Sequence, residues 1–361
     1  MLFKILNLHL LNRFSFSNRE NILKKIYLKD IAKDLNVSKT AVSLVLNNKG
    51  NENKISQDTQ KKILEYAKKH NYAANSLARG LSRGKSETIG LIIPEISDDH
   101  YAKIAGHIER KAKEYGYVVV YASSNRDPKN ETKLIQSMIN RQVDGLIIAS
   151  TQQNSKDIDM LLENNYPFVL VDRIYPEKET NYVLVDNFEG VQKATEHLLN
   201  LGRRKIGFIT LEPGLEAMRQ RLLGYQETLK QFNIKPKNSL VKELSNLDYK
   251  FQIKDALEDL VRFPNRVDSI IFSTHYLTSL GLRELRRLNI KVPNEVAIVS
   301  FDERGAFDLV DPPITSIKQP GSEIGELSVD ILIDEIQGNK NVVDKTRMLE
   351  PFLIVRKSCG A

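Results

Sequence analysis

Apolar residues near the start of the chain recur at the spacing of an amphipathic helix. Segment 28–35 carries them at positions i, i+3, i+4 and i+7, and segment 39–47 repeats this stripe. Between the two segments, Asn36 suits the positive-φ position that ends a helix and Ser38 suits the N-cap of the next one. The pattern therefore predicts two helices that cross at a tight turn. The apolar stripes consist of Leu28, Ile31, Ala32, Leu35, Val42, Val45 and Leu46.

The polar face of the second predicted helix carries side chains suited to DNA. In a helix-turn-helix, the second helix lies in the major groove, with its N-terminal residues on base edges and its hydroxyls and amides on phosphates. Lys39 and Thr40 are therefore the predicted base-reading residues. Ser38, Ser43 and Asn47 are the other predicted DNA contacts of this helix. By spacing alone, an ordinary helical hairpin would be the commoner structure.

The distribution of charge favours DNA binding over the ordinary hairpin. The 361 residues include 53 Lys and Arg and 46 Asp and Glu, for a formal net charge of +7. Residues 1–90 contain 17 of the basic and 7 of the acidic residues, so the remainder contains 36 and 39. The excess positive charge is confined to the first quarter of the chain, as expected for a segment that binds a polyanion.

Beyond residue 87, short apolar runs alternate with helical stretches. Continuous apolar strands between helices predict parallel sheets that are covered on both faces. Residues 87–361 exceed what one sheet of average size uses, so we expect two doubly wound lobes. The runs are TIGLII, YVVVYA, DGLIIA, FVLVD, KIGFIT, SIIFS and VAIVSF.

Polar residues follow several of these strands. Ligands of open parallel sheets bind outside the carboxyl ends of the strands, so these residues are candidates for a ligand pocket. Each of them also has an ordinary structural role open to it, such as capping a helix or a turn. The candidates are Ser97, Asp98, Ser150, Thr151, Asp172, Arg173, Asp186, Ser273, Thr274, His275, Tyr276 and Asp302.

From about Ile26 to Lys357, the order of motifs resembles the LacI/GalR family of bacterial transcription regulators. The resemblance implies an N-terminal all-α helix-turn-helix domain, a hinge helix and an α/β core like the periplasmic sugar-binding proteins. The core would have two lobes of doubly wound parallel sheet, joined by three crossovers near Asp186, Pro320 and Lys345. The residues that carry the resemblance are LKDIAKDLNVSKTAVSLVLN, KISQDTQKKILEYAKKHNYAANSLARGLSRGKSETIGLIIPEIS, VDGLIIAS, PFVLVDR, YVLVDNFEGVQKATEHLLNLGRRKIGFIT and VAIVSFDERGAFDLVDPPITSIKQP.

The resemblance also sets the expected domain boundaries. Residues 1–25 are too short and polar to span a membrane. Because members of the family usually begin a few residues before the helix-turn-helix, these residues would be a disordered extension or the product of a wrongly assigned start codon. The further boundaries are 26–73 for the DNA-binding domain, 74–86 for the hinge and 87–361 for the effector-binding and dimerisation core, with an N-lobe of 87–186 and 320–345 and a C-lobe of 187–319 and 346–361.

The segment NSLARGL gains its meaning from the same resemblance. In similar proteins it is a hinge helix whose leucine, here Leu81, wedges into the minor groove of the operator and kinks it. Asn75, Ala78 and Arg79 are the other expected contacts of the hinge with DNA. A flexible linker is the alternative. The match of residues 80–84 to the G-x-S-x-G motif of hydrolases is attributed to chance, because a helix rather than a strand is expected before Ser82.

For the effector, the resemblance assigns Arg221 as the arginine that grips the ligand and Asp302 as the matching carboxylate. The alternative for Arg221 is a pair with Glu216 or Glu227 of its own helix. Carboxylates and guanidinium groups suit vicinal hydroxyls, so we expect a sugar or sugar derivative. The expected effector-binding residues are Ser97, Asp98, His100, Tyr101, Ser150, Asp172, Asp186, Arg221, His275 and Asp302.

Several positions depart from the family pattern. Ala41 and Leu44 stand where similar regulators often have a hydroxyl residue and an arginine, so the operator half-site should differ. Asp99-His100 replaces a frequent Pro-Phe, and His275-Tyr276 replaces a frequent Asn-Asp. His275 would bond a ligand or cap the following helix. The identity of the effector is therefore left open.

The sequence predicts a transcriptional regulator, and we expect a repressor that binds operator DNA as a homodimer without a cofactor. The six histidines lack metal-ligand spacing, and no cofactor-binding or catalytic motif stands in its required context. A single cysteine, Cys359, is typical of a reducing cytoplasm. The rival classes are a solute-binding protein of a transporter, which would lack the DNA-binding module, and an α/β enzyme.

Overall fold

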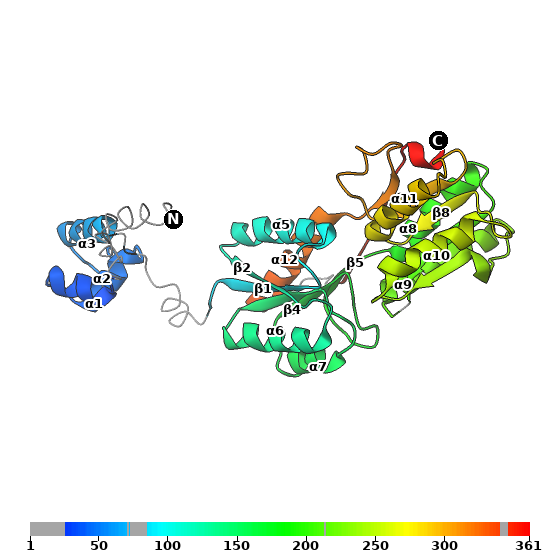
Figure 1. Ribbon diagram of the computed structural model, residues 1–361. Helices are drawn as coiled ribbons and strands as arrows, with labels where there is room; N and C mark the ends of the chain where they lie inside the picture. The colour runs from blue at the N-terminus through cyan, green and yellow to red at the C-terminus, as the bar shows by residue number, and fades with distance from the viewer. Residues whose placement is uncertain (1–25, 71, 73–84, 213, 340–345) are drawn as a thin grey trace, which may run out of the picture. The chain divides into compact units, whose positions relative to one another are not determined.

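The computed structural model divides into two compact units, Met1–Gly84 and Lys85–Ala361 (Figure 1). The residues that it describes are 26–70, 72, 85–212, 214–339 and 346–361.

The first unit contains three helices around a small apolar core. α1 (Leu28–Asp34) and α2 (Lys39–Leu46) are the two helices that the apolar stripes predict, and α3 (Gln57–Lys69) packs against them. In the turn, Asn36 has a φ of 51°, and the Ser38 hydroxyl accepts a hydrogen bond of 3.0 Å from the backbone three residues later. The predicted turn chemistry is thus confirmed. The buried core residues are Ile31, Ala32, Val42, Val45 and Ile63.

The N-lobe of the second unit is built on a six-stranded sheet whose neighbouring strands are all parallel. The strand order is β11-β5-β4-β3-β1-β2. Helices α5 and α12 cover one face, and α6 and α7 cover the other (Figure 1). The elements are β1 (Thr88–Ile93), α5 (Asp99–Glu114), β2 (Val118–Ser123), α6 (Pro128–Asn140), β3 (Gly145–Ile148), α7 (Ser155–Glu163), β4 (Phe168–Val171), β5 (Tyr182–Val185), α12 (Gly321–Gln337) and β11 (Thr346–Leu349).

The C-lobe repeats this architecture with the strand order β12-β10-β9-β8-β6-β7. Helices α8 and α9 bury their apolar faces against one side of the sheet, and α10 and α11 against the other. Two 3-10 helices, Asn238–Leu240 and Lys357–Cys359, flank the strands. The elements are α8 (Asn187–Asn200), β6 (Ile206–Leu211), α9 (Glu216–Gln231), β7 (Val241–Leu244), α10 (Tyr249–Val261), β8 (Ser269–Phe272), α11 (His275–Arg287), β9 (Ala297–Phe301), β10 (Thr315–Lys318) and β12 (Phe352–Ile354).

The crossovers between the lobes follow β5, β10 and β11. The chain leaves the N-lobe at Asp186 and returns at Pro320, where the sequence predicted it. The third expected position, near Lys345, is wrong. β11 pairs with β5 of the N-lobe, so the chain crosses at Glu350 and Pro351 instead. Only the strand pairing decides where the third crossover lies, because a short segment at a lobe boundary can pair with either sheet.

The C-lobe sheet also departs from purely parallel pairing. β12 runs antiparallel to β10. The reason is that β11 carries the chain toward the junction of the lobes, so the chain enters the second sheet at the edge where β10 ends. A two-residue link leaves no room for the helical crossover that a parallel strand would need.

Close helix packing depends on glycine at two positions. A Cβ on Gly224 of α9 would lie 2.4 Å from the carbonyl oxygen of Phe188 in α8. A Cβ on Gly325 of α12 would lie 3.1 Å from the carbonyl oxygen of Ile104 in α5. Each pair covers one face of a lobe, so these glycines set how closely the helices approach.

Among the described helices, none has the length and apolar character needed to cross a membrane.

Candidate functional site

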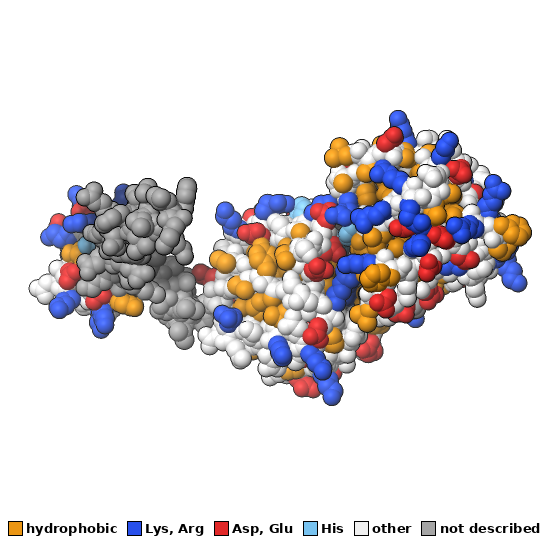
Figure 2. Space-filling model, in the orientation of Figure 1, with side chains coloured by type: hydrophobic (Ala, Val, Ile, Leu, Met, Phe, Trp, Pro, Cys, Tyr) orange, Lys and Arg blue, Asp and Glu red, His pale blue; other side chains and the backbone are white. Residues whose placement is uncertain are grey.

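The N-terminal end of α2 presents the two predicted base-reading residues. Lys39 and Thr40 are both exposed, and Figure 2 shows further Lys and Arg side chains on the surface of this unit. Ser38 uses its hydroxyl as the N-cap of α2. At the C-terminal end of α2, the Asn47 amide donates a 2.8 Å hydrogen bond to the Ser43 carbonyl, one turn earlier. Ser38 and Asn47 therefore have structural roles as well as their predicted DNA contacts.

The two departures from the family pattern lie on the same helix. Ala41 and Leu44 are half-buried. Neither side chain offers a hydrogen-bond donor or acceptor, so neither can make a base contact by side-chain hydrogen bond.

The predicted hinge contacts Asn75, Ala78, Arg79 and Leu81 lie outside the described residues, as do the extension 1–25 and the G-x-S-x-G match. The description resumes at Lys85, where Asp144 anchors the chain to the N-lobe. Its carboxylate accepts hydrogen bonds from the Ser86 backbone (2.6 Å) and hydroxyl (2.9 Å) and from the Glu87 backbone (2.9 Å). Asp144 thus fixes the end of the linker, a role that no sequence motif indicated.

A cavity of about 520 Å³ lies at the carboxyl ends of both sheets, between the lobes. Its size falls in the range of small-molecule sites. Both lobes contribute side chains to its wall. Seven of the ten predicted effector-binding residues line it: Asp98, His100, Tyr101, Asp172, Arg221, His275 and Asp302.

Asp302 is the centre of the polar contacts from the C-lobe. Its carboxylate accepts a hydrogen bond from the Gln319 amide and lies 3.5 Å from Nδ1 of His275 and 3.9 Å from the guanidinium of Arg221. Burial alone would raise the pKa of Asp302, but the hydrogen bond with His275 and the charge of Arg221 hold it well below its usual range. The residue is therefore ionised at neutral pH. It has a φ of 71°, in the left-handed region that non-glycine residues seldom adopt.

Arg221 is held rigidly beside Asp302. Its guanidinium donates to the Asn187 amide oxygen (2.7 Å) and to the Ser273 carbonyl (2.6 Å), and it lies 3.6 Å from the centre of the Phe301 ring. Glu216 and Glu227, the alternative partners on its own helix, bind Arg219 and Lys230 instead. The guanidinium is thus fixed toward the cavity, as a ligand-gripping group requires.

A second buried cluster comes from the N-lobe. The Tyr101 hydroxyl donates a 2.6 Å hydrogen bond to Asp172, and the Arg173 guanidinium lies 3.3 Å from the same carboxylate. Burial, together with the negative charge of Asp172, raises the pKa of Tyr101 well above its usual value, although Arg173 opposes the shift. The hydroxyl stays protonated and orients the carboxylate toward the cavity.

Two histidines from different lobes face the polar region. His275 Nε2 lies 3.8 Å from Asp98 of the N-lobe, while its Nδ1 lies near Asp302. Thr274, not His275, caps α11, since its hydroxyl accepts the 3.3 Å hydrogen bond from the Leu277 backbone. Nε2 of His100 is buried and has no hydrogen-bond partner among the described residues. An unpartnered buried nitrogen costs about 1–3 kcal/mol, which a bound hydroxyl would relieve.

Three predicted residues do not reach the cavity. Ser97 is exposed and donates to Glu95. Ser150 is fully buried and donates a 2.9 Å hydrogen bond to Glu131. Asp186 caps α8 by accepting a 2.8 Å hydrogen bond from the backbone three residues later. In all three cases local hydrogen bonds, which the strand-end rule ignores, decide where the side chain points.

The cavity also contains residues that were not predicted. Asn125 and Arg126 follow β2, and Gln319 follows β10. The rule that selected the other strand ends would have found them if it had been applied to these two strands. Met218 and Leu247 add apolar surface, and no sequence signal separated them from ordinary core or loop residues.

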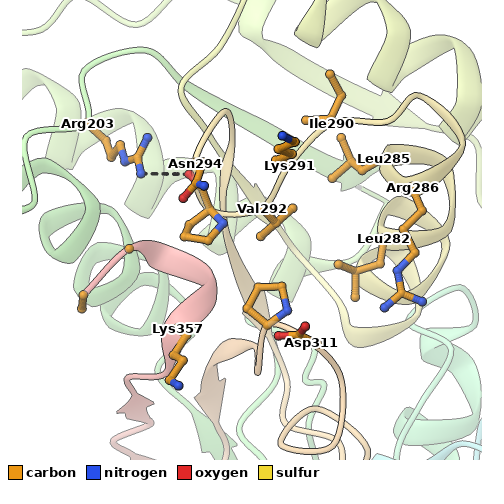
Figure 3. Close-up of a pocket in the computed structure, with 14 residues that line it drawn as sticks. Arg203, Leu282, Leu285, Arg286, Ile290, Lys291, Val292, Asn294, Asp311 and Lys357 are labelled. Carbon is orange, nitrogen blue, oxygen red and sulfur yellow. Dashed lines mark hydrogen bonds between the residues drawn. The ribbon is translucent and has the colours of Figure 1, made fainter.

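A larger depression of about 1010 Å³ lies on the C-lobe alone, between the end of α11 and the C-terminal segment (Figure 3). Its basic residues do not form a site like that of the cleft. The Arg203 guanidinium already donates to two backbone carbonyls at 3.1 Å, and Arg286, Lys291 and Lys357 are exposed. In Figure 3, these three side chains do not converge on one point. The cleft between the lobes is therefore the candidate ligand site.

Comparison with known proteins matches both units. Residues 27–75 match the profile described as bacterial regulatory proteins, lacI family, and residues 195–359 match that of a periplasmic binding protein-like domain. The chain is 30% identical over 332 residues to the ribose operon repressor of Halalkalibacterium halodurans, which covers 92% of this chain and 96% of that protein.

Solved structures agree in fold. A complex of the transcriptional regulator CelR with cellobiose has a TM-score of 0.69 at 26% identity and covers 92% of this chain and 99% of its own. The lac repressor dimer bound to operator and the anti-inducer ONPF has a TM-score of 0.81 at 22% identity and covers 94% of this chain and 100% of its own.

Proposed function

This chain belongs to the LacI family of bacterial regulatory proteins, and from that premise we propose how its two units divide the work of a ligand-controlled repressor. The protein is a DNA-binding transcriptional regulator and not an enzyme. The first unit contacts operator DNA, and a sugar or sugar derivative in the cleft changes the affinity of that contact. No cofactor takes part, and the protein acts in the cytoplasm, where its DNA target lies.

For DNA recognition, α2 lies in the major groove with Lys39 and Thr40 on base edges and Ser38, Ser43 and Asn47 near phosphates. A homodimer presents two such helices to the two halves of a pseudo-palindromic operator. The overall likeness to a lac repressor dimer on its operator supports this assembly.

For the hinge, we propose that residues 74–86 connect a DNA-binding domain of 26–73 to the core. Leu81 enters the minor groove, with Asn75, Ala78 and Arg79 beside it. The N-lobe then comprises 87–186 and 320–349, and the C-lobe 187–319 and 350–361, since the third crossover follows β11.

For the ligand, the fixed groups of the cleft suit vicinal hydroxyls. Asp302 and Asp172 accept hydrogen bonds, Arg221 donates them, and His100 offers a buried nitrogen that has no partner within the described chain. The relatives fit this chemistry: one solved structure is a cellobiose complex, and one relative is named for a ribose operon.

Ligand binding is coupled to DNA binding through the contacts that join the lobes across the cleft. His275 faces Asp98 at 3.8 Å, Gln152 accepts a 3.3 Å hydrogen bond from the Glu216 backbone, and Arg126 lies 5.8 Å from the Tyr276 ring. A ligand that binds between these groups changes the angle between the lobes. The population of the DNA-binding arrangement then shifts by the ligand's differential affinity for the two states.

The observation that carries the proposal is that one chain contains both an exposed N-terminal end of α2, with Lys39 and Thr40, and a polar cavity between two lobes. To test it, an operator is first selected from a random DNA pool with the full-length protein. The affinity of the protein for this operator is then measured by fluorescence anisotropy with and without ribose, glucose, cellobiose, nucleosides and phenyl glycosides. We expect at least one ligand to change the affinity.

Variants separate the DNA-reading role from general charge. Lys39→Ala should weaken binding to the selected operator by about 1–3 kcal/mol and relax its sequence preference. Lys62→Ala is the control, because Lys62 is paired with Asp58 at 2.7 Å on α3. Equal losses for the two variants would contradict the assignment of Lys39 as a base reader.

A further inference from the structure

The cleft has two chemically different halves. The polar half, around Asp302, Arg221 and His100, is described above. The other half is an apolar wall, supplied by the C-lobe at the end of β6, the start of α9 and the loop after β7. The wall consists of Leu211, Leu215, Ala217, Met218 and Leu247.

Leu247 is the most informative residue of this wall. Its side chain lines the cavity but is 88% exposed, whereas Leu211 is only 2% and Met218 only 7% exposed. A large apolar side chain left in water at the edge of a ligand cavity gains free energy when an apolar ligand group covers it. Sugar hydroxyls placed against these apolar side chains would lose water without gaining a hydrogen-bond partner from them, and Asn246 beside Leu247 is the polar side chain of this loop that lines the cavity.

The volume of the cleft points the same way. The cavity of about 520 Å³ lies well above the lower end of the range of roughly 300–1,000 Å³ that small-molecule sites span. It can therefore hold a ligand larger than one hexose. A single sugar in the polar half leaves the apolar half open.

Planar groups also line the cleft. Tyr276 and Arg126 both line the cavity, and the Arg126 guanidinium lies 5.8 Å from the centre of the Tyr276 ring. The Arg126 side chain is 38% exposed, so it is not fully covered by other side chains. Guanidinium and tyrosine faces favour stacking with aromatic rings.

From these observations we propose that the effector is a glycoside with a planar, apolar substituent on its sugar. The sugar hydroxyls occupy the polar half between His100 of the N-lobe and Asp302 of the C-lobe. The substituent lies against Leu215, Met218 and Leu247. Two classes of compound share this chemistry, namely nucleosides and aryl glycosides. The inference rests on the proposed function, since it assumes that the cleft binds the effector.

The test compares matched ligands by isothermal titration calorimetry on the full-length protein. Adenosine and cytidine are compared with ribose, and phenyl β-glucoside is compared with glucose and cellobiose. We expect the substituted member of at least one series to bind about tenfold or more tightly than its unsubstituted partners. The series that responds identifies the source of the substituent.

Two variants locate the substituent. Leu247→Asn should weaken the preferred ligand by roughly three- to tenfold and leave binding of the free sugar unchanged, because only the substituent reaches this residue. Leu309→Asn is the matched control, since Leu309 is 84% exposed on the same lobe and does not line the cavity. His100→Phe should weaken the substituted and the free ligand alike.

The outcomes separate the two proposals. If a free sugar or cellobiose binds as tightly as every substituted ligand, the inference is overturned and the sugar-responsive regulator stands. If Leu247→Asn and Leu309→Asn behave alike, the apolar wall is not the substituent site. If no sugar, nucleoside or glycoside binds or changes operator affinity, both the inference and the proposed class of effector fail.

Discussion

Asp302 is the residue on which the polar contacts of the cleft converge. It faces Gln319, His275 and Arg221 from inside the protein, and its side chain is only 11% exposed. Replacing it removes the carboxylate that lies beside a buried guanidinium and a buried imidazole. A change at this residue is therefore expected to affect the stability of the C-lobe as well as the proposed ligand site.

We expect Asp302→Asn to weaken effector binding by about 1.5–3 kcal/mol, which is roughly 10- to 150-fold, because a charge-assisted acceptor is lost. Calorimetry with the ligand found for the wild type measures this loss. Asp308→Asn is a suitable control, since Asp308 is exposed on the same lobe. Unchanged affinity in Asp302→Asn would remove this carboxylate from the ligand site.

The same variant carries a prediction on pH. The pKa of Asp302 in the folded protein lies below its ordinary value of 3.8, so the ionised form stabilises the fold at higher pH. This stabilisation is complete above the unfolded pKa and is lost as the pH falls toward the folded pKa. The difference in unfolding midpoint between wild type and Asp302→Asn should thus be largest above about pH 5 and shrink below 3.8. A difference that grows with acid would contradict the ion-pair account.

Residue-level prediction from sequence succeeded where one geometric rule governs the side chain. Asp172 and Asp302 directly follow strands, Asp98 lies in the loop after β1, and all three line the cleft, as the rule for parallel sheets predicts. Ser150 also ends a strand, yet it turns to Glu131 in the N-lobe. The position of a residue after a strand fixes where its backbone lies, but neighbouring hydrogen bonds decide the direction of its side chain.

At the scale of elements, the packing of α8 against α9 depends on one backbone contact. Gly224 brings the helices so close that the Phe188 carbonyl occupies the place of a Cβ. The two helices together cover one face of the C-lobe sheet. Arg221 lies one turn before this contact, so a change in the packing would also move the guanidinium.

Gly224→Ala should therefore destabilise the protein by about 1–3 kcal/mol, because backbone atoms must shift to admit the methyl group. Gly106→Ala on α5 is the matched control, since a Cβ there meets nothing within 4 Å. In the control, the gain in helix propensity should raise the stability slightly, by about 0.5–1 kcal/mol. The midpoints of urea unfolding measure the change in stability of both variants relative to the wild type. Equal midpoints for the two variants would mean that the close contact is easily relieved.

The hinge is an element for which the sequence supplies the whole argument. Leu81 lies in the segment 73–84, outside the described residues. If it wedges into the minor groove, Leu81→Ala should abolish most specific operator affinity and leave non-specific DNA binding nearly unchanged. Binding of the selected operator and of a scrambled duplex is compared by anisotropy. Intact specific affinity would refute the wedge.

At the scale of the whole molecule, charge and ligand chemistry are divided between the units. The net positive charge lies within residues 1–90, and the cleft of the second unit is lined by both acidic and basic groups. Contacts with DNA phosphates release counterions and are therefore sensitive to salt. Contacts of a largely buried cleft are screened much less.

Raising salt from 50 to 200 mM should thus weaken operator binding by roughly 10³-fold if about six phosphates are contacted. Effector affinity should change by less than about threefold over the same range. Anisotropy and calorimetry on one protein preparation give the two slopes. A salt-insensitive operator complex would contradict the assignment of the basic unit to DNA.

The sequence by itself determined the parts of this protein that follow from local periodicity and local charge. The stripes of Leu28 to Leu46 place two crossed helices, because a helical period leaves one face to be buried. The continuous apolar runs after residue 87 place parallel sheets that helices cover on both faces. The family resemblance adds the order of these parts. None of this requires knowledge of contacts between distant residues.

Tertiary structure alone decided what depends on such contacts. The pairing of β11 with β5 moved the third crossover to Glu350 and Pro351. Folding also placed Leu247 beside a polar cleft and left His100 Nε2 buried and unpartnered within the described chain. The physical reason is that burial and hydrogen bonding are set by neighbours in space, whereas periodicity reports only neighbours along the chain.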